Sequence, residues 1–250
     1  MSIPALSTQG LDKRFGSLVV ASDINLTIPH GVRYALIGPN GAGKTTLINL
    51  ITGMLRPDAG RICLGDADIT AFTPDARVKH GLVRTFQINA LFPHLNALEA
   101  VTLAVCERRG VAGDWWRPLP AYGEAVEEAY TILDSLMLAP DCYRLTRELA
   151  YGQQRLLEIA LALATRPKVL LLDEPAAGVP REESAELFAA IAGLSKDITV
   201  LFIEHDMDLV FRFASRIIVM VGGRILVEGT PQEIAADARV REVYLGGDAP

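Results

Sequence analysis

The spacing of hydrophobic residues predicts strands at the beginning of the chain. Residues 1–30 alternate weakly between apolar and polar positions, with apolar pairs in "SLVV" and "INLTI" set apart by Gly16 and Pro29. Such alternation is typical of antiparallel strands. The continuous apolar run "RYALI" at 33–37 predicts a short buried strand, and the residues after it predict a helix over 45–53.

The middle of the chain has a helical pattern instead. From about 83 to 166, "NALEAVTLAV" and "EAVEEAYTILDSLML" repeat apolar residues at helical spacing. A glycine- and proline-rich loop separates these two stretches and carries Trp115 and Trp116. We interpret the two tryptophans as packing or partner contacts.

Strand and helix patterns alternate again after residue 168. The runs "KVLLL" and "ITVLFI" are short enough to be buried parallel strands. Between them, "SAELFAAIAGL" places four apolar residues on one helical stripe: Leu187, Phe188, Ile191 and Leu194. "RIIVMV-GGR-ILVEG" predicts a hairpin. The order is therefore α/β, a helical insertion and α/β, without an internal repeat.

Composition narrows the classes of protein. Half of the 250 residues are hydrophobic and 22% are charged, which suits one large domain with a buried core. The net charge of −6 argues against nucleic acid as a partner. Three widely spaced cysteines fit neither a zinc site nor a disulfide framework, as expected in a reducing cytoplasm. No apolar run approaches the ~20 residues that cross a bilayer, so we expect a soluble protein that can still have a membrane partner.

The segment "GPNGAGKTT" predicts a phosphate-binding loop. Gly38, Gly43, Lys44 and Thr45 match G-x-x-x-x-G-K-[ST] between a predicted strand and a predicted helix. Glycines let backbone N–H groups turn toward an anion, and the helix N-terminus adds partial positive charge. Lys44 is predicted to reach the β and γ phosphates, and the Thr45 hydroxyl to ligate Mg²⁺. The alternative, a glycine-rich turn that binds nothing, leaves the lysine and hydroxyl unexplained.

The segment "VLLLDEP" ends a predicted buried strand in two carboxylates. Ligand sites in open α/β sheets lie at the carboxyl ends of strands. Asp173 is therefore predicted to hold Mg²⁺ opposite Thr45, and Glu174 to polarise a water for attack on the γ phosphate. A solvated acidic strand end is the alternative for this motif taken alone.

Six motifs in this order resemble the ATP-binding cassette (ABC) ATPases, the nucleotide-binding subunits of transporters. Besides the two motifs above, they are the Q-loop "RTFQ" at 84–87, the signature motif "LAYGQQR" at 149–155, the D-loop "AAGVP" at 176–180 and the histidine motif "IEHD" at 203–206. The resemblance implies an α/β P-loop NTPase fold with a RecA-like parallel-sheet core, an N-terminal antiparallel β subdomain and an inserted helical subdomain. It implies one ABC ATPase domain over 1–250, with the core in 1–87 and 166–250 and the helical subdomain in 88–165.

The resemblance also assigns roles to single residues. Gln87 of the Q-loop is expected near Mg²⁺ and the attacking water, and His205 at the γ phosphate. Catalysis is thus assigned to Glu174, His205, Gln87 and Lys44, and Mg²⁺ to Thr45, Gln87 and Asp173. The residues expected to hold ATP are Phe15, Asn40, Gly41, Ala42, Gly43, Lys44, Thr45 and Thr46. Phe15 would stack on adenine, and core packing is the alternative for this ring. For Gln87 the alternative is an ordinary surface glutamine, and for His205 it is a histidine whose hydrogen bonds are satisfied at the end of a strand.

The signature motif departs from the family's usual LSGGQ. Ala150 and Tyr151 replace its serine and first glycine. In the family this segment caps the ATP of a second subunit, so Ala150, Tyr151, Gly152 and Gln153 are expected to act in trans. Ala150 lacks the hydroxyl that bonds the γ phosphate, a loss of about 1–2 kcal/mol unless it is replaced. The D-loop has Pro180 where an aspartate is common.

The departures resemble one branch of the family. "LAYGQQRLLEIALALAT", "DEPAAG", "IEHDMDLV" and "VREVYLGG" are similar to ATPases of branched-chain amino-acid importers and their urea and amide relatives. The alternatives are a lipopolysaccharide-export ATPase, a non-transport ABC ATPase that works on ribosomes or DNA, and an ATP-switched scaffold that does not hydrolyse.

A transporter subunit of this kind implies several partners. We expect transmembrane permease subunits, a second ATPase subunit in a homo- or heterodimer, an indirect link to a solute-binding protein, and no nucleic acid. The expected location is cytoplasmic, peripheral on the inner face of the cell membrane. Leu91, Phe92 and Pro93 are candidates for the permease contact, with packing in the helical subdomain as the alternative.

Overall fold

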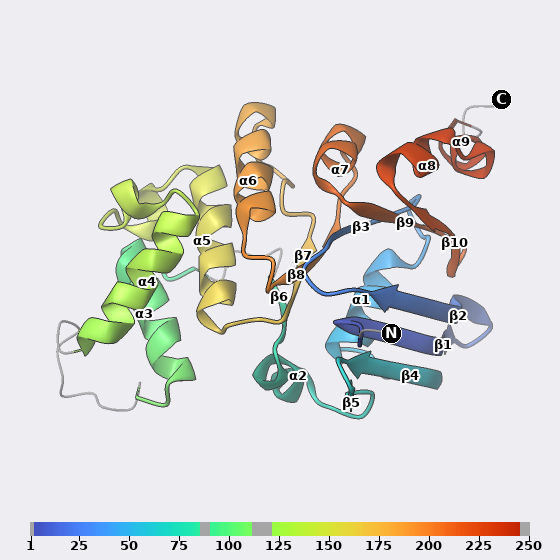
Figure 1. Cartoon of the computed structure of the whole chain (residues 1–250), viewed down its shortest axis with the longest axis horizontal. Coiled ribbons are helices and arrows are strands. Elements are labelled where there is room, and N and C mark those ends of the chain that lie inside the picture. Colours follow the sequence, from blue (N-terminus) through green and yellow to red (C-terminus); the bar gives the residue numbers. More distant parts are fainter. Residues whose placement is uncertain (1–2, 86–90, 112–121, 246–250) are drawn as a thin grey trace. The chain divides into compact units, whose positions relative to one another are not determined.

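The computed structural model of the chain separates into two compact units. It describes residues 3–85, 91–111 and 122–245. The first unit comprises 1–82, 168–174 and 195–250, and the second comprises 83–167 and 175–194. Figure 1 shows the elements along the chain. Among the described residues, no helix has both the length and the hydropathy that crossing a membrane requires.

The first unit begins with an antiparallel sheet. Its strand order is β2-β1-β4-β5, and its strands are β1 (Leu6–Phe15), β2 (Leu18–Ile28), β4 (Ala59–Leu64) and β5 (Ala67–Asp68). Strands β1 and β2 pair antiparallel from Leu6 opposite Ile28 to Phe15 opposite Leu18. The weak alternation in the first 30 residues therefore predicted these two strands correctly.

A second sheet has mainly parallel strands. Its order is β10-β9-β3-β8-β7-β6, with β3 (Arg33–Ile37), β6 (Leu82–Arg84), β7 (Val169–Asp173), β8 (Thr199–Ile203), β9 (Arg216–Val221) and β10 (Arg224–Gly229). Strand β3 runs parallel to β8 and β9, and β7 runs parallel to β8. The predicted hairpin is β9–β10, whose turn residues Gly222 and Gly223 both have positive φ, as a tight two-residue turn requires.

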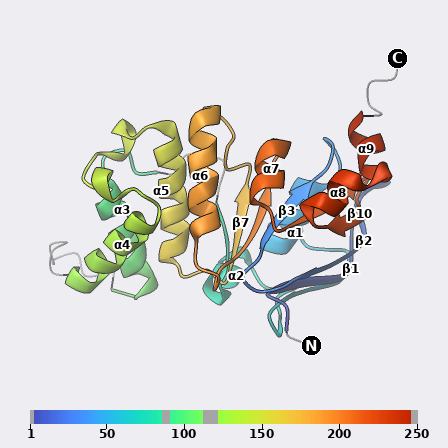
Figure 2. The same ribbon diagram turned by 45° about the horizontal axis from the view of Figure 1, so that its top comes forward.

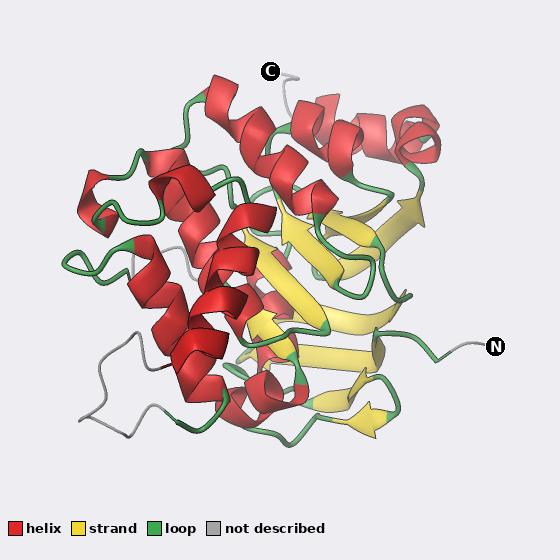
Figure 3. Ribbon diagram, turned by 60° about the vertical axis from the view of Figure 1, so that its left-hand side comes forward, coloured by secondary structure: helices red, strands yellow, loops and turns green. Residues whose placement is uncertain are grey.

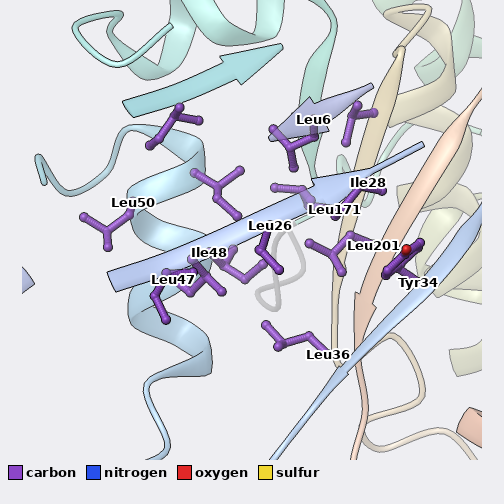
Figure 4. Close-up of a cluster of buried hydrophobic side chains, with 14 of the residues drawn as sticks. Leu6, Leu26, Ile28, Tyr34, Leu36, Leu47, Ile48, Leu50, Leu171 and Leu201 are labelled. Atoms are coloured by element: carbon purple, nitrogen blue, oxygen red, sulfur yellow. The ribbon is translucent and has the colours of Figure 1, made fainter. Parts of the chain in front are cut away.

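One hydrophobic core joins both sheets of this unit to the helix α1 (Lys44–Thr52). Figure 4 shows Leu47, Ile48 and Leu50 of α1 beside side chains from strands of both sheets, among them Leu26 and Leu36. These side chains are almost wholly buried. The core therefore fixes where α1 begins, which is the end of the predicted phosphate loop. The helix starts one residue earlier than the sequence pattern predicted.

The remaining helices of the first unit are short. They are α2 (Pro74–His80), α7 (Met207–Phe213), α8 (Pro231–Ala236) and α9 (Ala238–Leu245). Helix α8 packs against β9 and β10, and Figure 2 shows it beside β10. The buried guanidinium of Arg77 on α2 donates to the carbonyl oxygens of Leu50 and Ile51, so it satisfies acceptors at the end of α1.

The second unit is helical in its described part. It contains α3 (Ala97–Arg108), α4 (Gly123–Ser135), α5 (Tyr151–Ala164), α6 (Arg181–Gly193) and two 3₁₀ turns, Ala139–Asp141 and Thr146–Glu148. Helices α3, α4 and α5 pack on one another, and α6 packs on α5. In Figure 3 the helices are red, which makes this contrast with the yellow strands visible. Leu187, Phe188 and Ile191 of the predicted stripe are buried on α6, while Leu194 is its buried C-cap.

An ion-pair cluster joins the C-terminal ends of α3 and α5 to the middle of α4. Glu128 accepts from Arg108, Arg109 and Arg166 at 2.7–2.8 Å. The bond from Arg108, supported by the other two arginines, lowers the pKa of Glu128 to about 2. Arg108 also donates to the carbonyl of Ala164, the last residue of α5. The cluster thus anchors the helix that starts at the signature motif.

Candidate functional site

Three neighbouring parallel strands end at one edge of the sheet in the first unit. Strand β8 lies between β3 and β7, and the last residue of β7, Asp173, is paired with Ile203, the last residue of β8. The phosphate loop follows β3, Glu174 follows β7 and His205 follows β8 after one residue. Carboxyl ends of parallel strands form the usual ligand edge of such sheets, so the fold places these motifs together.

Glycines shape the loop between β3 and α1. A Cβ at Gly38 would lie 2.1 Å from the carbonyl oxygen of Met220, and one at Gly43 would lie 2.5 Å from that of Val20. Gly43 also has φ +99°, which side chains rarely adopt. The loop therefore packs against strands β9 and β2 through positions where no side chain fits.

Lys44 is buried in the loop that it follows. Its Nζ donates to the carbonyl oxygens of Gly38 at 2.6 Å and Pro39 at 3.1 Å, and the residue is 7% exposed. Burial lowers the pKa of the ammonium, while the negative charges of Glu174 and Asp173 oppose that shift. Because the Lys44 charge senses both carboxylates, the two motifs predicted to act together do lie within electrostatic range.

The N-terminus of α1 presents donors rather than acceptors. Its N-cap is Gly43, which makes no side-chain capping bond, and its first turn contains no acidic residue. Thr45 is exposed and Thr46 is half-buried in that turn. A helix N-terminus that has no side-chain cap and no carboxylate in its first turn is suited to bind phosphate.

Glu174 and His205 form a pair across the strand ends. His205 Nε2 lies 2.9 Å from Glu174 Oε1. Glu174 has φ +49°, and its N–H donates to the carbonyl of Ile203 at 3.0 Å. A non-glycine residue in this strained conformation is often found where a side chain must be aimed at a site. Asp173, one residue earlier, is buried at 8% exposure.

Glu204 lies beside His205 at the same strand ends, although the sequence pattern predicted no role for it. It is 5% exposed, and its Oε2 accepts from the His205 N–H at 3.1 Å. A buried carboxylate at this point fixes the backbone that carries the histidine. The signal was present in "IEHD", because an acidic residue at the end of a continuous apolar strand is unusual.

The donor set fits a magnesium-bound nucleoside triphosphate. The loop offers N–H groups and a buried ammonium for phosphates, at positions where glycines leave room. A threonine hydroxyl and a carboxylate, from Thr45 and Asp173, are oxygen ligands of the kind that Mg²⁺ prefers. Gln87, the third predicted metal ligand, lies outside the described residues, as do Trp115 and Trp116.

Phe15 is available for stacking. It ends β1 and is 50% exposed, and the Lys13 ammonium lies 5.6 Å from its ring centroid. Half-exposure contradicts core packing as the sole role of this ring. The contact of Phe15 with adenine stays a prediction.

The C-terminal helix reaches the phosphate loop in the same unit. Burial raises the pKa of Tyr244 on α9 to about 12, and a hydrogen bond from the backbone of Gly38 opposes the shift. Tyr244 also lines a cavity of about 290 Å³ together with Ile37, the residue before Gly38, and with Phe211 and Ile234. The end of the chain therefore supports the loop, a contact that no local sequence pattern indicated.

The signature segment, in the second unit, forms the N-terminus of α5. Ala150 is the N-cap and makes no side-chain capping bond. The Gln153 side chain partly replaces the missing cap. Its Oε1 accepts from the Ala150 N–H, and its Nε2 donates to Asp141 Oδ2 at 2.6 Å. The Gly152 N–H donates to Glu183 Oε2 at 3.2 Å. The N–H groups expected to serve a partner's phosphate thus have acceptors within the chain.

The D-loop leads into α6 in the same unit. The Val179 N–H donates to the Ala176 carbonyl at 3.0 Å, and Pro180 is the N-cap of α6. Proline suits this place, since the first residues of a helix need no N–H donor inside the helix. Of the candidates for a permease contact, Phe92 is 60% exposed, Pro93 is exposed and Leu91 is half-buried.

Comparison with known proteins agrees with this geometry. The model of the ABC transporter family matches residues 21–177, and that of the branched-chain amino acid ATP-binding cassette transporter matches 224–250. Among solved structures, the ADP conformation of MJ1267, an ATP-binding cassette of an ABC transporter, has a TM-score of 0.84 and 35% identity over 98% of this chain and 99% of that one. The structure of cbiO1 from Clostridium perfringens, part of the ABC transporter complex cbiONQ, has a TM-score of 0.80 and 26% identity, covering 98% and 96%.

Curated relatives align along almost the whole chain. The high-affinity branched-chain amino acid transport ATP-binding protein BraF of Pseudomonas aeruginosa is 40% identical over 98% of this chain and 99% of its own length. LivG of Escherichia coli, described in the same words, is 39% identical over the same shares. The probable LivG of Methanocaldococcus jannaschii is 35% identical over 96% of this chain and 97% of its length. These matches and the P-loop architecture confirm the predicted fold class: the chain belongs to the ABC transporter family, as an ATP-binding subunit that couples ATP hydrolysis to transport.

Proposed function

We propose that this subunit energises the uptake of branched-chain amino acids or a closely related small solute. The observation that carries the solute class is the match of residues 224–250 to a model specific to branched-chain amino acid cassettes. The names of BraF and LivG, at 40% and 39% identity, support the same class. Residues 224–250 include Tyr244, which contacts the phosphate loop, so this specific region is linked to the nucleotide site.

In the proposed reaction the first unit holds the nucleotide. Lys44 binds the β and γ phosphates, and Thr45 and Asp173, with Gln87, would hold Mg²⁺, which would neutralise charge on the phosphates. Glu174 accepts a proton from the attacking water, and His205, at 2.9 Å from Glu174, contacts the γ phosphate. Phosphoryl transfer has a loose transition state, so these residues act by placement and charge rather than by covalent chemistry.

The second half of each site comes from another subunit in this proposal. The segment 150–153 caps the ATP bound by a second ATPase subunit, so ATP closes a head-to-tail dimer and hydrolysis opens it. Permease subunits in the membrane take up the movement, which places the chain on the inner face of the cell membrane. The exposed Phe92 and Pro93 are candidates for that contact.

Replacing Glu174 tests the catalytic part of the proposal. Glu174→Gln keeps the shape of the side chain and removes the base, so turnover should fall at least about 100-fold while ATP and Mg²⁺ still bind. Size-exclusion chromatography with ATP and Mg²⁺ should then show a trapped dimer. Glu186→Gln, on the exposed face of α6, is the matched control and should turn over normally. A Glu174→Gln chain that hydrolyses at the normal rate would remove Glu174 from the mechanism.

The solute class needs the membrane partners. The chain should be purified with the permease subunits that accompany it and reconstituted in vesicles with candidate binding proteins. Uptake of labelled leucine, isoleucine or valine that requires ATP is the expected result. Uptake of urea or a short amide alone would move the chain to the related importers, and movement of lipopolysaccharide would overturn the importer assignment.

A further inference from the structure

The tyrosine in the signature motif lies against the D-loop of the same chain. A Cβ placed on Gly178 would lie 3.2 Å from two atoms of Tyr151, its Cε1 and its hydroxyl oxygen. Contacts this short are tighter than ordinary packing, so the bare Gly178 backbone is what allows the ring to approach. Gly178 also has φ +78°. The ring of Tyr151 therefore fits a gap that the D-loop glycine leaves open.

Arg155 holds the ring in this place from one turn further along α5. Its Nη2 donates to the Tyr151 hydroxyl at 2.8 Å, and its guanidinium carbon lies 5.1 Å from the ring centroid. The same Nη2 lies 3.5 Å from the carbonyl oxygen of Ala177. Arg155 is itself only 6% exposed and is paired with Glu158 at 2.9 Å. A buried, ion-paired guanidinium is a fixed support, because its other contacts leave it little freedom.

We propose that Tyr151 is a positioning residue that joins the signature turn to the D-loop, so that the two segments move as one body when a second subunit's nucleotide is capped. This rests on the proposed function, in which residues 150–153 cap that nucleotide. Pro180 stands where an aspartate is common in the family that the motifs resemble, so this D-loop lacks one side chain that could transmit closure. The ring of Tyr151 on Gly178 supplies a connection that the glycine of the usual signature could not make.

The ring of Tyr151 orders the D-loop more than it stabilises the whole chain. The D-loop is short, and within it the Val179 N–H donates to the Ala176 carbonyl oxygen. An aromatic ring with two χ angles restricts a neighbouring backbone at low entropic cost. Fixing the D-loop in advance removes an ordering penalty from dimer closure. Since orientation of reacting groups contributes strongly to rate, the effect should appear in turnover and not in nucleotide binding by the phosphate loop.

The test compares Tyr151→Gly with Tyr151→Phe in the full chain. The glycine variant has the family's usual residue but no ring, and the phenylalanine variant keeps the ring and loses the Arg155 bond. We expect kcat for ATP hydrolysis to fall roughly tenfold in Tyr151→Gly, with KM changed less than about twofold, and to stay within about twofold of the parent in Tyr151→Phe. Amide hydrogen exchange of a peptide covering 176–180 should speed up in the glycine variant alone.

Two controls separate this proposal from the function on which it rests. Binding of a fluorescent ATP analogue should be the same in all three proteins, and each should remain folded at the assay temperature, which excludes a general folding defect. ATP-dependent dimerisation of Glu174→Gln tests the proposed function itself. If that dimer forms while Tyr151→Gly keeps full kcat and parental exchange over 176–180, the positioning role is wrong and the sandwich mechanism stands. An equal loss in Tyr151→Phe and Tyr151→Gly would also overturn the role of the ring.

Discussion

Two helix N-termini in this molecule are both expected to meet phosphate, yet they differ in what already surrounds them. Helix α1 follows Gly43, which makes no side-chain capping bond, and its first turn contains no acidic residue. Helix α5 follows Ala150, which likewise makes no side-chain capping bond. At α5, however, Gln153 accepts from the Ala150 N–H, and the carboxylate of Glu183 accepts from the Gly152 N–H.

The difference indicates two kinds of phosphate contact. The dipoles of the two helices are alike, since each exposes partial positive charge at its first turn. At α1 a phosphate finds donors and a lysine. At α5 it must displace or tolerate a carboxylate that uses one of the donors. The first end is suited to hold a nucleotide alone, and the second is suited to a contact that forms only when a dimer closes.

The largest expected effect comes from breaking the first of these ends. Lys44→Ala removes the buried ammonium that donates to Gly38 and Pro39. Charge-assisted bonds to phosphate are among the strongest in proteins, so ATP affinity should fall about 100-fold or more. Equilibrium binding of a fluorescent ATP analogue measures this directly. The matched control, Lys79→Ala, removes an exposed lysine on α2 and should leave affinity unchanged.

An unchanged affinity in Lys44→Ala would mean that backbone donors alone hold the nucleotide. The two helix N-termini would then differ only in the side-chain acceptors that Gln153 and Glu183 provide at α5. A folding defect is a separate outcome, recognised by a lower thermal midpoint without nucleotide. Lys44→Arg distinguishes loss of the charge from a change in its position, because it keeps the positive charge while changing its geometry.

The sequence predicted the first end well and the second end incompletely. The phosphate loop, α1 and the strands β3, β7 and β8 are local patterns, and each was assigned from residues close together in the chain. The roles of single site residues stay predictions. Of the bonds that distinguish α5, the one from the Gly152 N–H to Glu183 joins residues 31 positions apart. The Tyr151 contact with Gly178 is of the same kind. A single sequence gives no signal for such pairs, because they depend on how α5 and α6 pack.

A smaller effect is expected from removing the charge at the second end. In Glu183→Gln an amide oxygen can still accept from Gly152, so the bond is kept while the negative charge is lost. A charge at a helix N-terminus contributes about 1 kcal/mol, and its repulsion of a phosphate should be similar. In a Glu174→Gln background, the ATP concentration for half-maximal dimerisation should therefore fall roughly fivefold.

Glu182→Gln is the matched control for this change. Glu182 is the preceding residue on α6 and is exposed, so its loss changes net charge by the same amount. If both variants dimerise at the same ATP concentration, only the overall charge matters and the Glu183 contact has no special role. Weaker dimerisation in Glu183→Gln would show that the carboxylate supports the closed form, reversing the comparison.

The smallest expected effect comes from restoring the usual signature serine. Ser is a good N-cap, so Ala150→Ser should stabilise α5 by about 1 kcal/mol and raise the thermal midpoint. If the hydroxyl also bonds the γ phosphate of a second subunit, kcat should rise about threefold. The two readouts need not agree. A higher midpoint with unchanged kcat would show that the hydroxyl caps its own helix, and that Gln153 and the remaining N–H groups already provide what capping in trans requires. A higher kcat would show that the N-terminus of α5, unlike that of α1, lacks a donor to phosphate, and that the serine hydroxyl of the usual signature motif supplies it.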